Sequence, residues 1–356
     1  MRPRRTQDYH QMLTRPQLLL ACCTLLFLVI GAPDKVGAEL IVSPTKIVLD
    51  SPEASQQIVV SVSTKDGRRD VTHEIKLAVA DDSIATVQGS SLVRPRSEGR
   101  TEISVTLGSE TVRVPVEVVK QRSPDPVSFR NEIIPILTKA RCNSGGCHGK
   151  AEGQNGFKLS IFGFDVESDY AALMKNGKGR RVSLTQPETS LLLLKGTSQM
   201  PHGGGRKIDE GSYRYQRVLR WIREGARLDP EASDAGQIVK IDVEPREQIL
   251  LAGGTQQLRV TAVDSSGVRR CVTVEAEYES NAAAIADVDH QGLILASDIP
   301  GEAAILVRYL GHVTSCRVTL PRPGVTFERP AESNFVDTHV WNQLARLGIK
   351  AGAAAS

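Results

Sequence analysis

The sequence predicts two all-β sandwiches that flank a mainly α-helical domain, with a short helix at the C-terminal end. Apolar residues alternate with period two over residues 39–120, and the same pattern returns over residues 238–321. Between these two segments the apolar period changes to about 3.6. A chain of 356 residues is long enough for two or three domains of this kind.

The first 38 residues have the organisation of a secretory signal peptide. Basic side chains precede an apolar run from Leu18 to Ile30, and Val36-Gly37-Ala38 then has the small-residue form of a cleavage site. An uncleaved membrane anchor is the alternative, because the apolar run is short for a span but could be extended at either end. We therefore expect an exported protein, periplasmic or at the cell surface, with no membrane span after signal cleavage.

The net charge of +3 belongs to this N-terminal segment. Residues 1–38 hold five basic and two acidic side chains, which leaves the remainder of the chain neutral. A neutral body with no basic stripe argues against nucleic acid as a partner.

Two of the six cysteines, Cys271 and Cys316, lie in the second β segment. Export to an oxidising compartment favours a disulfide between them, which would close a loop of about 45 residues and stabilise the fold by roughly 3–4 kcal/mol. Two free buried thiols are the alternative.

The two β segments align with each other at a period of about 200 residues. Residues 67–72 correspond to residues 267–273, and the glycines that open a late strand, Gly99 and Gly301, also correspond. Such a repeat indicates a duplicated domain with an insertion between the copies. Four arginines near the repeated turn are expected to be solvated: Arg68, Arg69, Arg269 and Arg270.

Both copies resemble bacterial group 2 immunoglobulin-like domains. These domains share the G-x-x-x-D-V-T turn and the closing strand that follows a glycine. The resemblance covers about 160 residues and implies spacers or adhesive units on an exported protein. A glycan or another cell-surface partner is therefore expected, and catalysis in either copy is not.

Linkers rich in Pro, Ser and Asp are expected at residues 121–127 and 229–237, and they bracket residues 128–228. Ser128 can cap a first helix, which Pro135 would kink or break. A last helix of this segment is expected to start near Ser212 and to stop at Gly225.

Residues 141–149 contain two cysteines followed at once by a histidine, the arrangement that covalent haem attachment needs. Cys142 and Cys147 would add to the porphyrin vinyl groups, and His148 would bind the iron. Four residues separate the cysteines instead of the usual two, so the loop must bulge, and Gly145-Gly146 can supply the unusual dihedral angles. The predicted cofactor is covalently bound haem c.

The second axial ligand is predicted to be Met200, in an irregular loop over residues 199–205, with His202 as the rival. Met174 is expected to fill the core. A nearby basic run is expected to be a solvated loop, with contact to the haem propionates as the alternative: Lys178, Arg180 and Arg181.

Residues 129–226 carry a string of motifs around this site: Cys147-His148-Gly149, Gly156-Phe157-Lys158-Leu159-Ser160, Gly179-Arg180-Arg181-Val182, Pro201-His202-Gly203-Gly204 and Trp221-Ile222-Arg223-Glu224-Gly225. This string resembles the cytochrome c-like domain of large exported planctomycete proteins. In such proteins a large conserved domain of unknown function often follows. Residues 322–356, with a helix expected over 334–347, resemble a linker and the start of that domain, which implies truncation there.

The first interpretation is therefore an exported c-type cytochrome module, spaced by immunoglobulin-like domains, that transfers single electrons to a redox protein the sequence does not identify. Whether the chain is an enzyme stays open, and an electron carrier is favoured over a catalyst. The alternative is a haem-free cell-surface binding, adhesion or stalk protein with a Cys142–Cys147 disulfide. A third possibility is a zinc site of Cys142, Cys147, His148 and His202.

Overall fold

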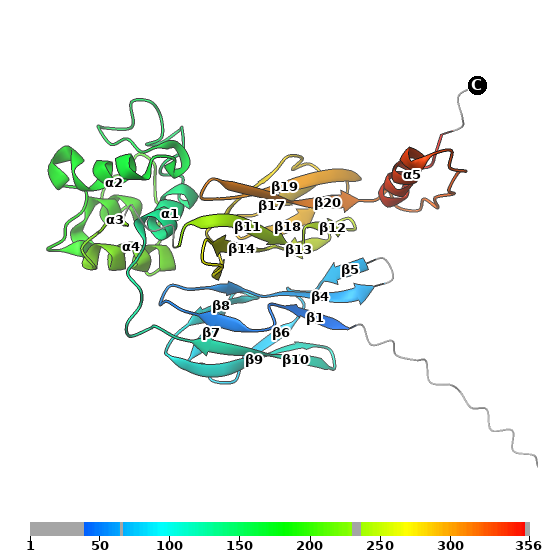
Figure 1. Ribbon diagram of the computed structural model, residues 1–356, viewed down its shortest axis with the longest axis horizontal. Coiled ribbons are helices and arrows are strands. Elements are labelled where there is room, and N and C mark those ends of the chain that lie inside the picture. The colour runs from blue at the N-terminus through cyan, green and yellow to red at the C-terminus, as the bar shows by residue number, and fades with distance from the viewer. Residues whose placement is uncertain (1–38, 65–66, 230–235, 353–356) are drawn as a thin grey trace, which may run out of the picture. The chain divides into compact units, whose positions relative to one another are not determined.

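The computed structural model describes residues 39–64, 67–229 and 236–352 (Figure 1). From residue 39 on, the described residues belong to one compact unit. The predicted signal peptide at residues 1–38 lies outside the described residues. No helix within the described ranges is long and apolar enough to cross a membrane.

The first β-sandwich consists of three small sheets with the strand orders β1-β4-β5, β2-β10-β9-β6 and β3-β8-β7. The long strands β9 and β10 pair antiparallel over their whole length, and β2 runs parallel to β10. Their alternate residues, among them Ile103 and Val105, point into a core that excludes water. The strands are β1 (Leu40–Ser43), β2 (Ile47–Leu49), β3 (Gln56–Gln57), β4 (Val59–Thr64), β5 (Gly67–Asp70), β6 (Lys76–Val79), β7 (Ala85–Gln88), β8 (Leu92–Pro95), β9 (Gly99–Leu107) and β10 (Glu110–Val118).

The second sandwich repeats the first strand for strand. Its sheets have the orders β11-β14-β15, β12-β20-β19-β16 and β13-β18-β17, and β12 again runs parallel to the last strand. Both predicted sandwiches are therefore present, with one topology. The strands are β11 (Ile238–Glu244), β12 (Glu247–Ile249), β13 (Thr255–Gln257), β14 (Arg259–Asp264), β15 (Arg269–Cys271), β16 (Glu277–Ser280), β17 (Ala286–Val288), β18 (Leu293–Ala296), β19 (Gly301–Tyr309) and β20 (His312–Leu320).

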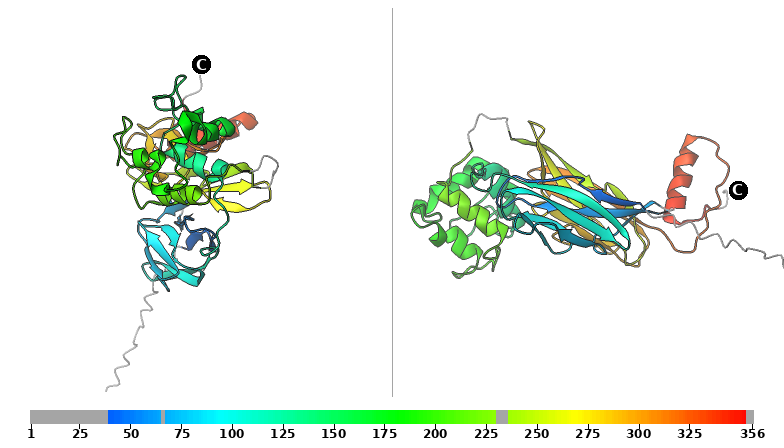
Figure 2. Two further views of the ribbon diagram at one scale, coloured as in Figure 1. Left: turned by 90° about the vertical axis from the view of Figure 1, so that its left-hand side faces the viewer. Right: turned by 90° about the horizontal axis from the view of Figure 1, so that it is seen from below.

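The prediction of a mainly α-helical cytochrome c-like domain between the sandwiches is wrong. The ordered architecture is dominated by the two sandwiches, which Figure 2 shows from two further sides, and the segment between them has only short helices. Its four α-helices have six, nine, six and eleven residues, and irregular chain separates them. They are α1 (Ile134–Lys139), α2 (Val166–Met174), α3 (Leu191–Gly196) and α4 (Tyr213–Arg223), with a π-helix at Phe129–Ile133 and short 3-10 turns at Ile161–Gly163, Asn176–Gly179 and Pro187–Thr189.

Helix ends in this segment follow their sequence signals. The Ser128 hydroxyl accepts a hydrogen bond from the Asn131 amide, and the π-helix gives way to α1 at Ile134, with Pro135 in the first turn of α1. The Ser212 side chain caps α4 by accepting from the Tyr215 amide. Aromatic packing joins these elements, since Phe129 lies 5.2 Å from Trp221 and 5.3 Å from Tyr170 between ring centroids.

The last described helix, α5 (Phe335–Leu347), agrees with the range of 334–347 that the sequence predicts. Asn334 and Asp337 form a capping box at its start, and Gly348 ends it in the left-handed conformation. Two apolar side chains one turn apart, Val336 and Val340, are exposed on it.

Candidate functional site

Residues 142–149 form a compact turn directly after α1. The Cys142 amide donates to the Leu137 carbonyl at 2.8 Å, which continues the helix into the turn, and the His148 amide donates back to the Cys142 carbonyl at 3.0 Å. Inside the turn the buried Asn143 amide group donates to the Thr138 hydroxyl at 2.9 Å. Backbone hydrogen bonds therefore fix Cys142 and His148 next to each other.

The glycines that shape this turn differ from the predicted ones. Gly145 and Gly146 do not adopt a positive φ, and a Cβ at either position would meet open space. Arg141 instead takes the left-handed conformation, with φ of 59°. Gly149 is the glycine that packing requires, because a Cβ there would lie 2.2 Å from the Asn143 carbonyl oxygen.

His148 is held by the strand-like segment that follows the turn. Its Nδ1 lies 3.0 Å from the Phe157 carbonyl oxygen, and its ring centroid lies 4.5 Å from that of Phe157. Since a carbonyl only accepts, Nδ1 carries the proton and Nε2 holds the free lone pair of the neutral ring. Burial lowers the pKa of His148, and the nearby His202 and Arg181 lower it further. His148 is therefore neutral at physiological pH and can accept a hydrogen bond.

His202 faces His148 across a cleft of about 670 Å³, which both cysteines of the turn also line. The two imidazole planes are parallel within 8°, with centroids 6.3 Å apart. The Nδ1 of His202 lies 2.9 Å from the Gly205 carbonyl oxygen, so Nδ1 carries a proton and donates to it. Lys195 and Lys207 also line the cleft, whose surface is otherwise largely apolar. It can accept hydrogen bonds from a ligand and attract a negatively charged group.

Four of the five residues predicted from sequence thus line one cleft, and Met200 does not. Met200 is 40% exposed on a turn after α3, where its amide donates to the Leu194 carbonyl. His202, the rival, is the side chain that the fold brings opposite His148.

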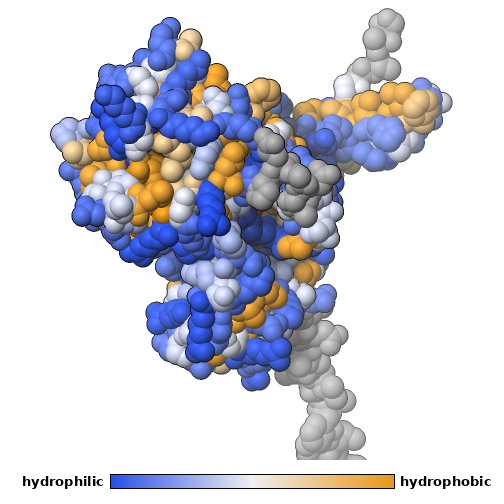
Figure 3. All heavy atoms as spheres, turned by 60° about the vertical axis from the view of Figure 1, so that its left-hand side comes forward, coloured by the Kyte–Doolittle hydropathy of each residue, from blue (hydrophilic) through white to orange (hydrophobic). Residues whose placement is uncertain are grey.

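Figure 3 looks onto the face where the segment between the sandwiches comes forward, and apolar surface lies there among hydrophilic side chains.

The cysteines of the chain are free thiols at the described positions. Burial raises the pKa of Cys142 to about 11 and that of Cys316 to about 12, so both are protonated at neutral pH. The expected disulfide between Cys271 and Cys316 is absent, and the alternative holds: Cys271 in β15 and Cys316 in β20 are free, buried thiols. The Cys142–Cys147 disulfide is absent as well. No group of three or more metal-binding side chains occurs among the described residues, so the zinc site has no support.

The side chain of Arg181 is buried and holds parts of the fold together, contrary to the expectation that it lies in a solvated loop. Its guanidinium donates to the carbonyls of Ala172, Asn176 and Gly156 at 2.7–2.8 Å and stacks over the Phe157 ring at 4.6 Å. The side chain is buried and ties α2 to the loop that orients His148. It shapes the wall of the cleft through backbone contacts.

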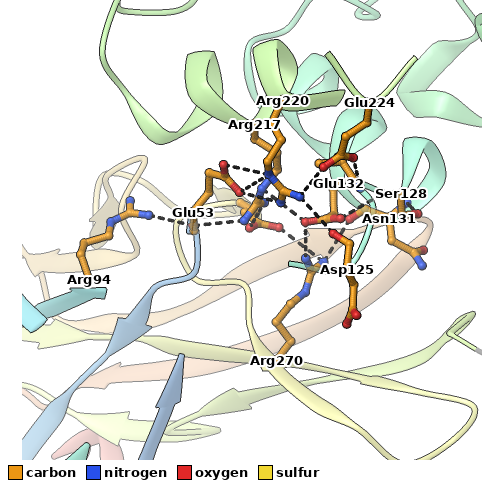
Figure 4. A network of polar contacts seen from close by, with 12 residues as sticks. Glu53, Arg94, Asp125, Ser128, Asn131, Glu132, Arg217, Arg220, Glu224 and Arg270 are labelled. Atoms are coloured by element: carbon orange, nitrogen blue, oxygen red, sulfur yellow. Dashed lines mark hydrogen bonds and ion pairs between the residues drawn. The ribbon is translucent and has the colours of Figure 1, made fainter. Parts of the chain in front are cut away.

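A second constellation, which the sequence did not indicate, joins both sandwiches to α4 (Figure 4). Arg217 of α4 is 1% exposed and donates to Glu275 of the second sandwich at 2.7 Å. It also donates to the Glu53 carbonyl of the first sandwich at 3.1 Å and lies 3.3 Å from a Glu132 carboxylate oxygen. One buried guanidinium therefore contacts three separate parts of the chain.

Neighbouring residues complete this charge network. Arg220, one turn after Arg217, forms a bidentate pair with the Glu53 carboxylate, with its shortest contact at 2.7 Å. Burial raises the pKa of Glu275, but Arg270 and Arg217 outweigh it, so the pKa is lowered and the carboxylate is charged. The buried positive and negative charges are paired, which is what burial of ionised groups requires.

Arg270 corrects the expectation of a solvated turn. It lies within 3.7 Å of Glu132 and 3.6 Å of Glu275, and it donates to the Asn131 carbonyl and the Tyr309 hydroxyl. Glu275 is five residues away, but Asn131 is 139 residues away in sequence, and no local pattern could indicate that contact. Arg68, Arg69 and Arg269 are exposed, as expected.

Comparison with known proteins gave a family match for the first β-sandwich. Residues 38–118 match the family model of the bacterial Ig-like domain, group 2. The comparison with curated proteins gave no match. Among solved structures, domains 4 and 5 of the S-layer protein SbsC are 24% identical over 23% of this chain and 51% of that one, with a TM-score of 0.20. Domains 5–6 of SbsC are 13% identical over 80% and 98%, with a TM-score of 0.31, and invasin, a bacterial integrin-binding protein, is 12% identical over 80% and 38%, with a TM-score of 0.17.

The interpretation as a c-type cytochrome that transfers electrons is wrong in the light of these findings. The family model that matches, over residues 38–118, is that of an immunoglobulin-like domain, and the described residues hold no cluster of three or more His, Cys, Asp or Glu side chains that could bind a metal ion. The findings give no support to haem or iron. The assignments of Cys142, Cys147, His148, Met200 and His202 as haem residues stay predictions.

Proposed function

We propose that this chain is a haem-free cell-surface module in which two immunoglobulin-like sandwiches and the segment between them form one rigid stalk or binding unit. The single observation that carries the proposal is the buried network around Arg217. It links Glu53 of the first sandwich, Glu132 before α1 and Glu275 of the second sandwich. A matched bacterial Ig-like domain supports a location outside the cytoplasm.

The network supports rigidity because its groups are desolvated and mutually dependent. Removing one partner of a buried ion pair costs about 3–5 kcal/mol, since the other charge stays buried without compensation. Separating the first sandwich from α4 would strip Glu53 from Arg220 and Arg217 at the same time. A stalk needs this property, because a spacer sets a distance only if its domains do not move freely.

The surface location can be tested on intact cells that produce the protein with an epitope after residue 350. Protease added outside the cells should remove the epitope without lysis, while a cytoplasmic marker stays intact. A variant without residues 1–38 is the control and should be protected. An epitope of the full chain that becomes accessible only after lysis would contradict the proposal.

A further inference from the structure

The two sandwiches contact each other through equivalent residues. Ser43 ends β1 opposite Val59, and Glu244 ends β11 opposite Arg259, so Ser43 and Glu244 occupy the same position in the two copies. The Ser43 hydroxyl donates to the Glu244 carboxylate, with its oxygen 3.1 and 3.2 Å from the two carboxylate oxygens. Two equivalent residues that touch each other lie on a local two-fold axis.

Two reciprocal hydrogen bonds lie on either side of this axis. The Gln57 amide donates to the Cys271 sulfur at 3.4 Å, and the Gln257 amide donates to a carboxylate oxygen of Asp70. Gln57 and Gln257 are equivalent, because each side chain donates to the carbonyl of the next residue. Asp70 and Cys271 are equivalent, because they pair with the third residue of β4 and of β14. The contact therefore has the pattern of a symmetric dimer interface.

The hydrogen bonds of this face close open sheet edges. β3, β5, β13 and β15 are all terminal strands of their sheets, so their outer backbone groups lack a strand partner. Gln57, Gln257, Asp70 and Cys271 are buried in the paired arrangement. In a single sandwich the backbone amides of Gln57 and Gln257 would be exposed, whereas in the pair each donates to an acceptor of the other sandwich.

We propose that this face also pairs between two copies of the chain, with the first sandwich of each copy bound to the second sandwich of the other. Exchange of the first sandwiches between two chains makes a closed two-fold dimer. The contacts in this dimer are those that already exist within one chain, so no new interface is needed. The connection from Val118 to Phe129 contains no helix or strand, and fully extended it reaches about 30 Å or more. The proposal rests on the sandwich pairing that the proposed function also uses.

The charge of Glu244, which lies on the two-fold axis, favours pairing of a first with a second sandwich over pairing of two second sandwiches. Glu244 contacts Ser43 and also Arg259, which donates to the Ser43 hydroxyl at 3.0 Å. A pair of two second sandwiches would bring Glu244 against another Glu244, and this like-charge contact disfavours that pairing. A partner that fits the face of the second sandwich is therefore the first sandwich of another copy.

The test uses two full chains that each carry one new cysteine, Ser43→Cys in one and Glu244→Cys in the other, with different affinity tags. A disulfide between these positions can form only between chains. The chains are unfolded together, refolded at high concentration and oxidised, and covalent heterodimers are measured on a non-reducing gel. Val313→Cys mixed with Glu244→Cys is the control, because Val313 is exposed in β20, which belongs to a different sheet from Glu244.

We expect several-fold more heterodimer from the axis pair than from the control pair. An equal yield overturns the exchange. A single chain with both Ser43→Cys and Glu244→Cys separates this result from failure of the proposed function. If that chain closes its own disulfide while the mixed chains form no heterodimer, the rigid unit stands and exchange is refuted. If it fails to close, the pairing of the sandwiches is wrong and both proposals fall. Light scattering of the wild-type chain after the same refolding gives a second readout, in which a dimer mass is expected and a purely monomeric mass contradicts exchange.

Discussion

Replacement of Arg217 by methionine tests whether the buried network stabilises the unit. Methionine keeps most of the volume of the arginine stem but removes the charge, so the effect is mainly electrostatic. Glu275 loses its contact at 2.7 Å and Glu132 its contact at 3.3 Å, while the Glu53 carbonyl loses a donor at 3.1 Å. Arg270 stays near both carboxylates, at 3.6 and 3.7 Å, and offsets part of the loss.

The expected loss is about 3–5 kcal/mol in the free energy of unfolding, the range for breaking a buried ion pair. Denaturant unfolding followed by fluorescence of Trp221, which lies in the same helix, measures it. Arg130→Met is a matched control, because Arg130 is 40% exposed in a similar pair with a Glu167 side chain that is 51% exposed, and it should cost about 0–1 kcal/mol. Equal losses for the two variants would refute the reasoning that burial makes this network matter.

Three further outcomes are expected. Gly149→Ala should lower the free energy of unfolding by about 1–3 kcal/mol, because its methyl group would press on the Asn143 carbonyl. Gly145→Ala is the control, because its methyl group meets open space and should leave the denaturant unfolding curve nearly unchanged. A larger loss for Gly145→Ala than for Gly149→Ala would contradict the turn geometry. Alkylation of Cys142, followed by peptide mass spectrometry, should rise with a midpoint near pH 11, and a midpoint near the usual 8.5 would show that the thiol is not buried. Since the folded-state pKa of Glu275 lies below its ordinary value of 4.5, its contribution to stability should be present above pH 4.5 and lost as the pH falls further. Glu275→Gln should flatten that part of the stability profile, and an unchanged slope would exclude Glu275 as the cause.

The sandwiches could be predicted from sequence because their signals are local. Alternating apolar residues specify which face of each strand is buried, and the aligned turns at residues 67–72 and 267–273 mark the duplication. The caps Ser128 and Ser212 were equally visible, since a capping side chain acts within three residues. These features depend on neighbours in sequence.

The network around Arg217 could not be predicted, because its partners come from residues 53, 132 and 275. A basic residue on an amphipathic helix usually faces solvent, and only the packing of two sandwiches against α4 makes this one buried. The same reason explains the error at Arg270, which a turn motif suggested to be solvated.

The cytochrome prediction failed because a string of short motifs over residues 129–226 was taken to indicate a whole domain. Cys142, Cys147 and His148 do lie together beside the cleft, as their spacing indicated. Their placement alone does not specify a mainly α-helical fold, and the helices α1 to α4 are short elements that pack around a core of their own at one end of the two β-sandwiches (Figure 1). The sequence therefore did not reveal the surrounding architecture, and the haem roles of these residues stay predictions.

Small-angle X-ray scattering of the secreted chain at physiological salt tests the central claim most directly, because it reports whether the two sandwiches keep a fixed arrangement. We expect one conformation to account for the curve, with the Arg130→Met variant unchanged and the Arg217→Met variant expanded. A wild-type curve that requires separated, independently moving sandwiches would contradict the claim that they form one rigid unit.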